Sequence, residues 1–69
     1  MPVEMAMKKA ADMLARGRIS ISECEKMIED LIVEEMKKIE GFDERMKAYS
    51  KLKRKAWYML LEVTRRFTK

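Results

Sequence analysis

The sequence of 69 residues contains no histidine, asparagine or glutamine, and it has one proline, two glycines and one cysteine, Cys24. Without histidine, a catalytic dyad or triad built on an imidazole base is excluded. Zinc sites formed by cysteine and histidine are excluded within one chain, and a single thiol excludes a disulfide framework. The di-iron sites of helix bundles also take histidine ligands. We therefore expect no enzyme activity and no cofactor, with Cys24 as an inert core residue.

The absence of asparagine and glutamine favours a thermophilic source, because these side chains are thermolabile and hot-adapted proteins are enriched in charged residues. The alternative is that a short, helix-rich chain lacks both by chance. The single thiol fits a reducing compartment, and residues 1–4 do not begin a signal peptide. The longest apolar run, 56–61, is far shorter than the roughly 20 residues of a membrane span. We therefore expect a cytoplasmic protein.

Apolar residues make up 48% of the chain and charged residues 41%, which indicates a folded domain rather than a disordered chain. Gly17 and Gly41 divide it into three stretches of helical periodicity, and glycine commonly closes a helix because it adopts left-handed backbone angles without a steric cost. We predict helices at about 3–16, 20–40 and 43–67. No strand-like alternation is present, so the whole chain is expected to be a single all-α domain.

Local patterns support the first two helices. In the first stretch the apolar residues share one helical face: Val3, Met7, Ala10 and Leu14. The second begins with Ser20-Ile21-Ser22-Glu23, which has the capping-box pattern of a serine three residues before a glutamate. Ile19 and Cys24 stand at the two positions of a hydrophobic staple. We therefore expect a well-defined helix start at Ser20.

Glu35 interrupts the apolar stripe of the second helix, since it shares the sector of Ile28 and Leu31 at 100° per residue. A buried carboxylate needs a partner, and Lys53 at the margin of the third helix is the available cation. One interpretation is a buried Glu35–Lys53 charge pair that fixes how the two helices align. The other is that Glu35 reaches solvent past a small neighbour.

The third helix is predicted to start at Asp43 as its N-cap, and its apolar stripe is expected to face the core. That stripe is Tyr49, Leu52, Ala56, Met59, Leu60, Val63 and Phe67. Because both connections are short, we expect a short helix followed by a long antiparallel helical hairpin. A chain of this size buries little core alone, so we expect a homodimer whose hairpins form a four-helix bundle. The alternative is a monomeric three-helix bundle.

Positions 14–32 resemble the SHOCT-type motif, a short helical interaction motif. The residues that carry the resemblance are Leu14, Gly17, Ile19, Ser20, Glu23, Cys24, Glu25, Leu31 and Ile32. Cys24 stands where that family prefers phenylalanine or tyrosine, and the long third helix is foreign to it. The resemblance implies an oligomerisation or interaction segment rather than a catalyst.

Charge is unevenly distributed along the chain, with a net charge of +2 over residues 1–18, −4 over 19–42 and +6 over 43–69. One face of the third helix, interrupted by Glu62, carries Lys47, Lys51, Arg54, Lys55, Tyr58, Arg65 and Lys69. Several cations along a rigid helix are typical of a surface that binds nucleic-acid phosphates. The other interpretation is that the acidic second helix pairs with the basic third helix and neutralises it.

Trp57 and Leu61 lie at the flank of the apolar stripe, beside Met46, where a monomer would leave them partly exposed. We predict that these three residues contact an oligomer partner or another protein, unless the first helix covers them. The sequence thus favours a small helical protein–protein interaction, adaptor or regulatory protein. The alternative is a nucleic-acid-binding regulator that uses the basic face of the third helix. We do not expect membrane binding, because the apolar stripe is needed for the bundle.

Overall fold

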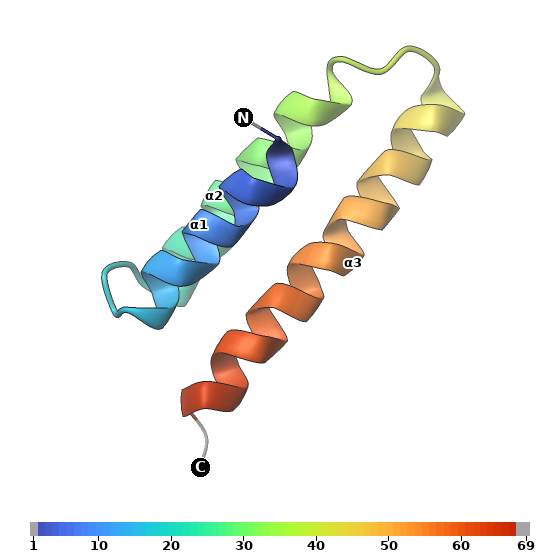
Figure 1. The fold of residues 1–69 in the computed structure, drawn as a ribbon. Coiled ribbons are helices and arrows are strands. Elements are labelled where there is room, and N and C mark those ends of the chain that lie inside the picture. Colours follow the sequence, from blue (N-terminus) through green and yellow to red (C-terminus); the bar gives the residue numbers. More distant parts are fainter. Residues whose placement is uncertain (1, 68–69) are drawn as a thin grey trace.

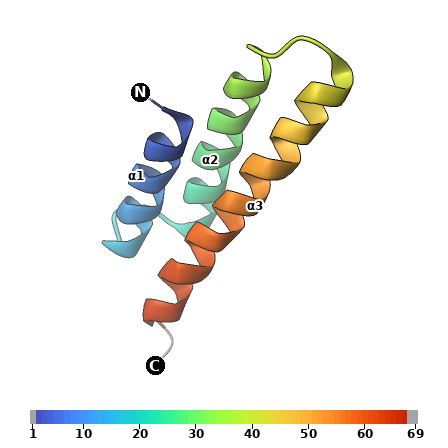
Figure 2. The ribbon, with the colours of Figure 1, turned by 45° about the vertical axis from the view of Figure 1, so that its right-hand side comes forward.

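The computed structural model describes residues 2–67, with side chains up to Arg66, and these residues form three α-helices and no strand (Figure 1). The helices are α1 (Val3–Ala15), α2 (Ile21–Met36) and α3 (Phe42–Phe67). Each helix contacts the other two. The chain reverses after α2, so that α3 lies alongside it, and α1 lies along the lower part of both (Figure 2). The predicted all-α class is confirmed.

The corner between α1 and α2 is closed by Gly17. Its φ of 71° lies in the left-handed region, and its backbone N–H donates to the carbonyl of Leu14 at 3.0 Å. The N–H of Arg18 donates to the carbonyl of Met13 at 2.9 Å. These two hydrogen bonds form a Schellman motif, which satisfies carbonyls at the helix end. Glycine therefore ends α1 as predicted, with Ala15 as its last residue.

The predicted capping box forms at the start of α2. The Ser20 hydroxyl accepts a hydrogen bond from the backbone N–H of Glu23 at 3.1 Å, and the Ser20 N–H donates to the Glu23 carboxylate at 3.0 Å. The hydrogen bond from the Ser20 N–H to the ionised carboxylate is the largest cause that holds the pKa of Glu23 below its ordinary value, and the Ser20 side chain adds to it. The start of α2 is thus set by the four residues from Ser20 to Glu23.

The structure differs from the predictions for the end of α2 and for the N-cap of α3. The second helix ends at Met36 rather than near residue 40, because the N–H groups of Lys38 and Ile39 bond to carbonyls only three residues back. The Ile39 carbonyl accepts instead from the Nε of Arg45 at 2.6 Å. Gly41, with a φ of 90°, precedes α3 directly, so Asp43 lies in the first turn instead of capping it.

The three helices enclose a core made of aliphatic and small side chains. Its buried residues are Met7, Ala10, Ala11, Leu14, Cys24, Ile28, Ile32, Leu52, Ala56 and Val63. The Cys24 thiol donates to the Ala10 carbonyl at 3.5 Å, and burial raises its pKa, which makes it a weak nucleophile. Because many of these side chains are small, the core is thin. In the described part of the chain, no helix combines the length and apolar character that crossing a bilayer takes.

Candidate interaction surfaces

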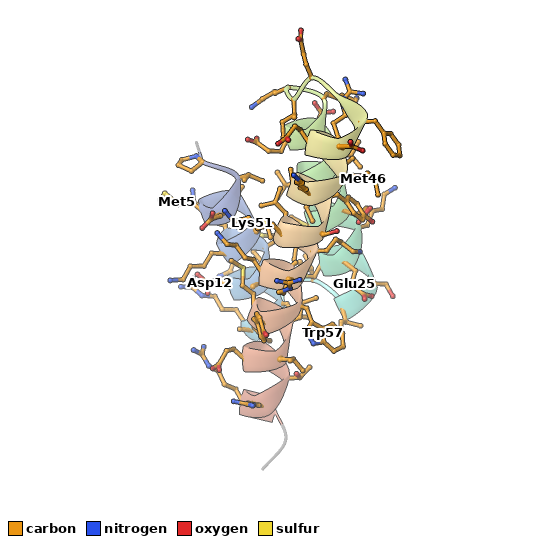
Figure 3. The ribbon with its side chains drawn as sticks, turned by 90° about the vertical axis from the view of Figure 1, so that its right-hand side faces the viewer. Met5, Asp12, Glu25, Met46, Lys51 and Trp57 are labelled. Atoms are coloured by element: carbon orange, nitrogen blue, oxygen red, sulfur yellow. The ribbon has the colours of Figure 1, made fainter. Side chains whose placement is uncertain are left out.

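The apolar stripe of α3 faces the core, but the largest side chain of the helix does not. Leu52, Ala56 and Val63 are buried, whereas 61% of Trp57 is exposed. At 100° per residue Trp57 lies about a quarter-turn outside the stripe, on the side of α2. In Figure 3, which looks onto α3, Trp57 points toward the side of α2 and Glu25. The ring therefore lies at the surface, where α3 meets α2.

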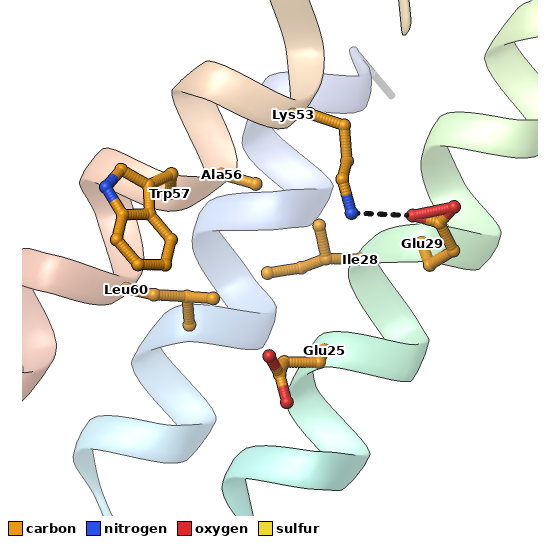
Figure 4. A pocket seen from close by; sticks show the side chains of 7 residues that line it. All are labelled: Glu25, Ile28, Glu29, Lys53, Ala56, Trp57 and Leu60. Atoms are coloured by element: carbon orange, nitrogen blue, oxygen red, sulfur yellow. Dashed lines mark hydrogen bonds and ion pairs between the residues drawn. The ribbon is translucent and has the colours of Figure 1, made fainter. Parts of the chain in front are cut away.

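Trp57 separates two adjoining hollows between α2 and α3, which we call the Trp57 groove. Glu25, Trp57 and Leu60 line both hollows. The other lining residues are Ile28, Glu29, Lys53 and Ala56 in the first, and Ile21, Leu61 and Thr64 in the second. Figure 4 looks into the first hollow, with the indole and Leu60 on one side and the polar groups of α2 on the other. The floor of the groove is thus apolar. Its α2 rim carries Glu25 and Glu29, and its α3 rim carries Lys53.

The polar end of the groove is an ion pair that joins the two helices. The Lys53 Nζ lies 3.2 Å from a Glu29 carboxylate oxygen, and the Tyr49 hydroxyl donates to the other oxygen at 3.1 Å. The hydrogen bond to Glu29 raises the pKa of Lys53 above its ordinary value. The Lys53 ammonium also lies 5.7 Å from the centre of the Tyr49 ring. This cluster links α3 to α2 at the level of Glu29.

The predicted buried pair between Glu35 and Lys53 does not form. Glu35 pairs with Lys38 at 3.5 Å, and 36% of its side chain is exposed. The alternative, in which Glu35 reaches solvent, describes it better. Glu29 was missed as the partner of Lys53, although the sequence holds a signal for it. Glu29 and Lys53 are each twelve residues from Gly41, so in two helices that fold back on each other they lie level.

The structure places the three predicted contact residues on one flank of α3. Met46 is 43% exposed and Leu61 is partly buried, with Trp57 between them along the helix. The first helix does not cover Trp57, because 61% of that side chain is exposed. Ile21, 48% exposed, was missed and extends this apolar surface onto α2. That Trp57 contacts a partner stays a prediction.

The predicted basic residues divide into two groups. Lys55 is drawn inward, since its Nζ lies 2.6 Å from the Glu4 carboxylate of α1. This hydrogen bond is the main cause that lowers the pKa of Glu4, and the positive charge of Lys51 adds to it. The exposed group, which we call the basic face, is Lys47, Lys51, Arg54, Tyr58 and Arg65. Lys69 lies outside the described residues.

A shallow depression lies on the basic face. It is lined by Met46, Lys47, Ser50, Lys51 and Arg54, and no carboxylate contributes to it. Lys47 lies 3.8 Å from Glu44, one turn earlier, at the limit of an ion pair. Lys51 and Arg54 make no ion pair with any residue that the structure describes. The depression therefore gathers three cations and a hydroxyl at the surface.

The acidic second helix does not neutralise the basic third helix. Between the described residues of α2 and α3 there is a single ion pair, Glu29–Lys53, and it lies at the groove rather than on the basic face. The other pairs of α2 are to neighbouring lysines of its own end, Lys37 and Lys38. The described residues also form no cluster of carboxylates and thiol that could hold a metal ion. The separation of charge along the sequence thus persists at the surface of the folded chain.

Comparisons with known proteins add no family to these observations. No family model matches the chain, and neither a curated protein nor a solved structure is significantly similar to it. The resemblance of positions 14–32 to the SHOCT-type motif therefore stays a prediction.

Proposed function

We propose that this protein is a non-catalytic interaction module that associates with a second copy of itself through the Trp57 groove. The observation that carries the proposal is the position of Trp57, whose ring is 61% exposed between two hollows. Tryptophan is enriched at the centres of protein interfaces, because it combines a large apolar area with few rotatable bonds. In a monomer the exposed part of the indole stays in contact with water, and a partner would bury this apolar area.

A second copy fits the groove by charge. Its α2 rim carries Glu25 and Glu29, and its α3 rim carries Lys53. A two-fold axis along the groove would lay α3 of one copy over α2 of the other. Lys53, which pairs with Glu29 of its own chain, would then also face the partner's Glu25, a carboxylate that makes no ion pair with a described residue. The same contact would form twice, which is the property of an isologous interface. A partner with one charge on both rims would not match this arrangement.

The size of this side of the molecule also fits a dimer. The fold measures 43 × 19 × 19 Å, so one long side offers about 800 Å², which is roughly one partner's share of a standard interface. Two of the exposed apolar residues, Ile21 and Trp57, line the groove itself. Dimerisation would also enlarge the core of a domain that is too small to bury much alone. An adaptor or regulatory role would follow from that assembled surface.

Sedimentation velocity over a range of protein concentrations tests the proposal. We expect a monomer–dimer equilibrium, with Trp57→Ser shifting it to monomer. Tyr58→Ser is the matched control, because Tyr58 is also 61% exposed but lies on the basic face. Trp57 is the only tryptophan, so its emission reports on the same site and should shift to shorter wavelength as the dimer forms. A protein that stays monomeric at all concentrations, or a Trp57→Ser variant that still dimerises, would refute this interface.

A further inference from the structure

We propose that the basic face of α3 binds the phosphate backbone of duplex nucleic acid, with the depression around Lys47, Ser50, Lys51 and Arg54 as its centre. The Trp57 ring does not line this depression, although Met46, which lies on the same flank of α3 as Trp57, does. Figure 3 shows Lys51 pointing toward the side of α1 and Trp57 toward the side of α2. A phosphate group in the depression would meet three cations and one hydroxyl donor, and no carboxylate lines it.

The cations of this face are free to exchange their present partners. Lys51 and Arg54 make no ion pair with a described residue, and the pairs of Lys47 and Arg65 are exposed contacts of 3.8 and 3.6 Å within α3. Exposed pairs of this kind contribute little to stability, so their loss costs little on binding. Lys55 is different, because it is held 2.6 Å from Glu4. We therefore assign the contacts to Lys47, Lys51, Arg54 and Arg65, and not to Lys55.

The spacing of these residues suits a duplex. Lys47, Lys51, Arg54, Tyr58 and Arg65 follow one another at intervals of three, four or seven residues, which keeps them on one face of the helix. From Lys47 to Arg65 the helix rises roughly 27 Å at 1.5 Å per residue. This is most of one turn of a duplex, about 34 Å, over which phosphates are closely spaced on both strands. A straight helix thus presents several cations to one stretch of backbone.

Two other anionic partners fit less well. Proteins that bind single strands stack successive bases on several aromatic rings, and the basic face has one exposed ring, Tyr58. A helix that lies on an anionic membrane buries its apolar face in the lipid, but the apolar stripe of α3 is buried in the core at Leu52, Ala56 and Val63. Binding to a duplex needs neither feature, because cationic side chains alone can contact its phosphate backbone.

Fluorescence anisotropy with a mixed-sequence DNA duplex of about 20 base pairs tests the inference. With three to four phosphate contacts, the logarithm of the binding constant should fall with that of the salt concentration with a slope of about −3. The double variant Lys51→Glu/Arg54→Glu should bind about tenfold more weakly or worse at low salt. The control is Lys9→Glu/Lys26→Glu, which changes the net charge equally at exposed positions of α1 and α2. It should stay within about threefold of the wild type.

Several results would overturn the inference. One is undetectable duplex binding at low salt, and another is an equal loss in the control, which would reduce the effect to net charge. Tighter binding to a single strand of the same length, or to anionic vesicles, would assign the face to a different ligand. Trp57→Ser should retain duplex binding, so failure of the dimer and failure of this site are distinguishable. Circular dichroism of each variant verifies that its helices are intact.

Discussion

Two neighbouring residues of α3, Ala56 and Trp57, show how differently the inside and the outside of this molecule are built. Ala56 is 5% exposed in a core of aliphatic and small side chains, while Trp57 is 61% exposed. No polar or charged side chain is buried among the described residues, and every ion pair lies at the surface. Stability should therefore come from the inner side chains, and recognition from the outer ones, Trp57 included.

The largest effect on stability should come from the core. Ile32 is fully buried in the second half of α2, and Ile32→Ala should lower the free energy of unfolding by about 2–5 kcal/mol. Trp57→Ala should change it by less than about 0.5 kcal/mol in dilute, monomeric protein, because the ring buries little there. Urea denaturation followed by circular dichroism measures both. If the two variants were equally destabilised, the Trp57 ring would contribute to the monomer's core, which would contradict the contrast between the buried and the exposed side chains.

A smaller effect is expected from the exposed hydrogen bonds that begin α2. Ser20→Ala removes the hydroxyl acceptor of the Glu23 N–H and should cost about 1 kcal/mol. Ser22→Ala is the matched control, since Ser22 is exposed inside the first turn and alanine favours a helix there. It should leave the unfolding free energy unchanged or slightly higher. A neutral Ser20→Ala would mean that Gly17 and the core alone determine where α2 starts.

The parts of the fold that sequence reasoning predicted are those decided by nearby residues. Gly17 needs only the last turn of α1, and the capping box needs only Ser20 and Glu23, so both could be predicted. The end of α2 could not, because residues 37–40 suit a helix and the turn is supported by the contact of Arg45 with the Ile39 carbonyl. That contact depends on the position of a helix that follows.

The same limit applies to the surfaces. Helical periodicity predicted which residues of α3 lie outside the stripe, so the exposure of Trp57 and of the basic face could be anticipated. The partner of each charge could not be found from periodicity alone, because it also depends on the level at which two helices align. Lys53 meets Glu29 rather than Glu35, and Lys55 meets Glu4 from the far end of the sequence. Pairing across helices is therefore the information that only the folded chain supplies.

The smallest effect should come from the exposed carboxylates Glu4 and Glu23. Each has its pKa held below the ordinary value near 4.5, Glu4 chiefly by its hydrogen bond with Lys55. A lowered pKa means that the charged form favours the folded state, so this contribution is present above about pH 4.5 and is lost as the pH falls through the folded-state pKa. The melting temperature should accordingly decline on acidification below that point.

A titration of the glutamate carboxyl carbons by NMR separates the two groups. Lys55→Met should raise the pKa of Glu4 toward its ordinary value and leave that of Glu23 low, because Glu23 depends on Ser20. Ser20→Ala should raise the pKa of Glu23 and leave that of Glu4 low. The backbone N–H of Ser20 remains in that variant, so part of the shift of Glu23 should persist. If Lys55→Met left the Glu4 pKa unchanged, the Lys55–Glu4 ion pair would not persist in solution, and Lys55 would join the basic face.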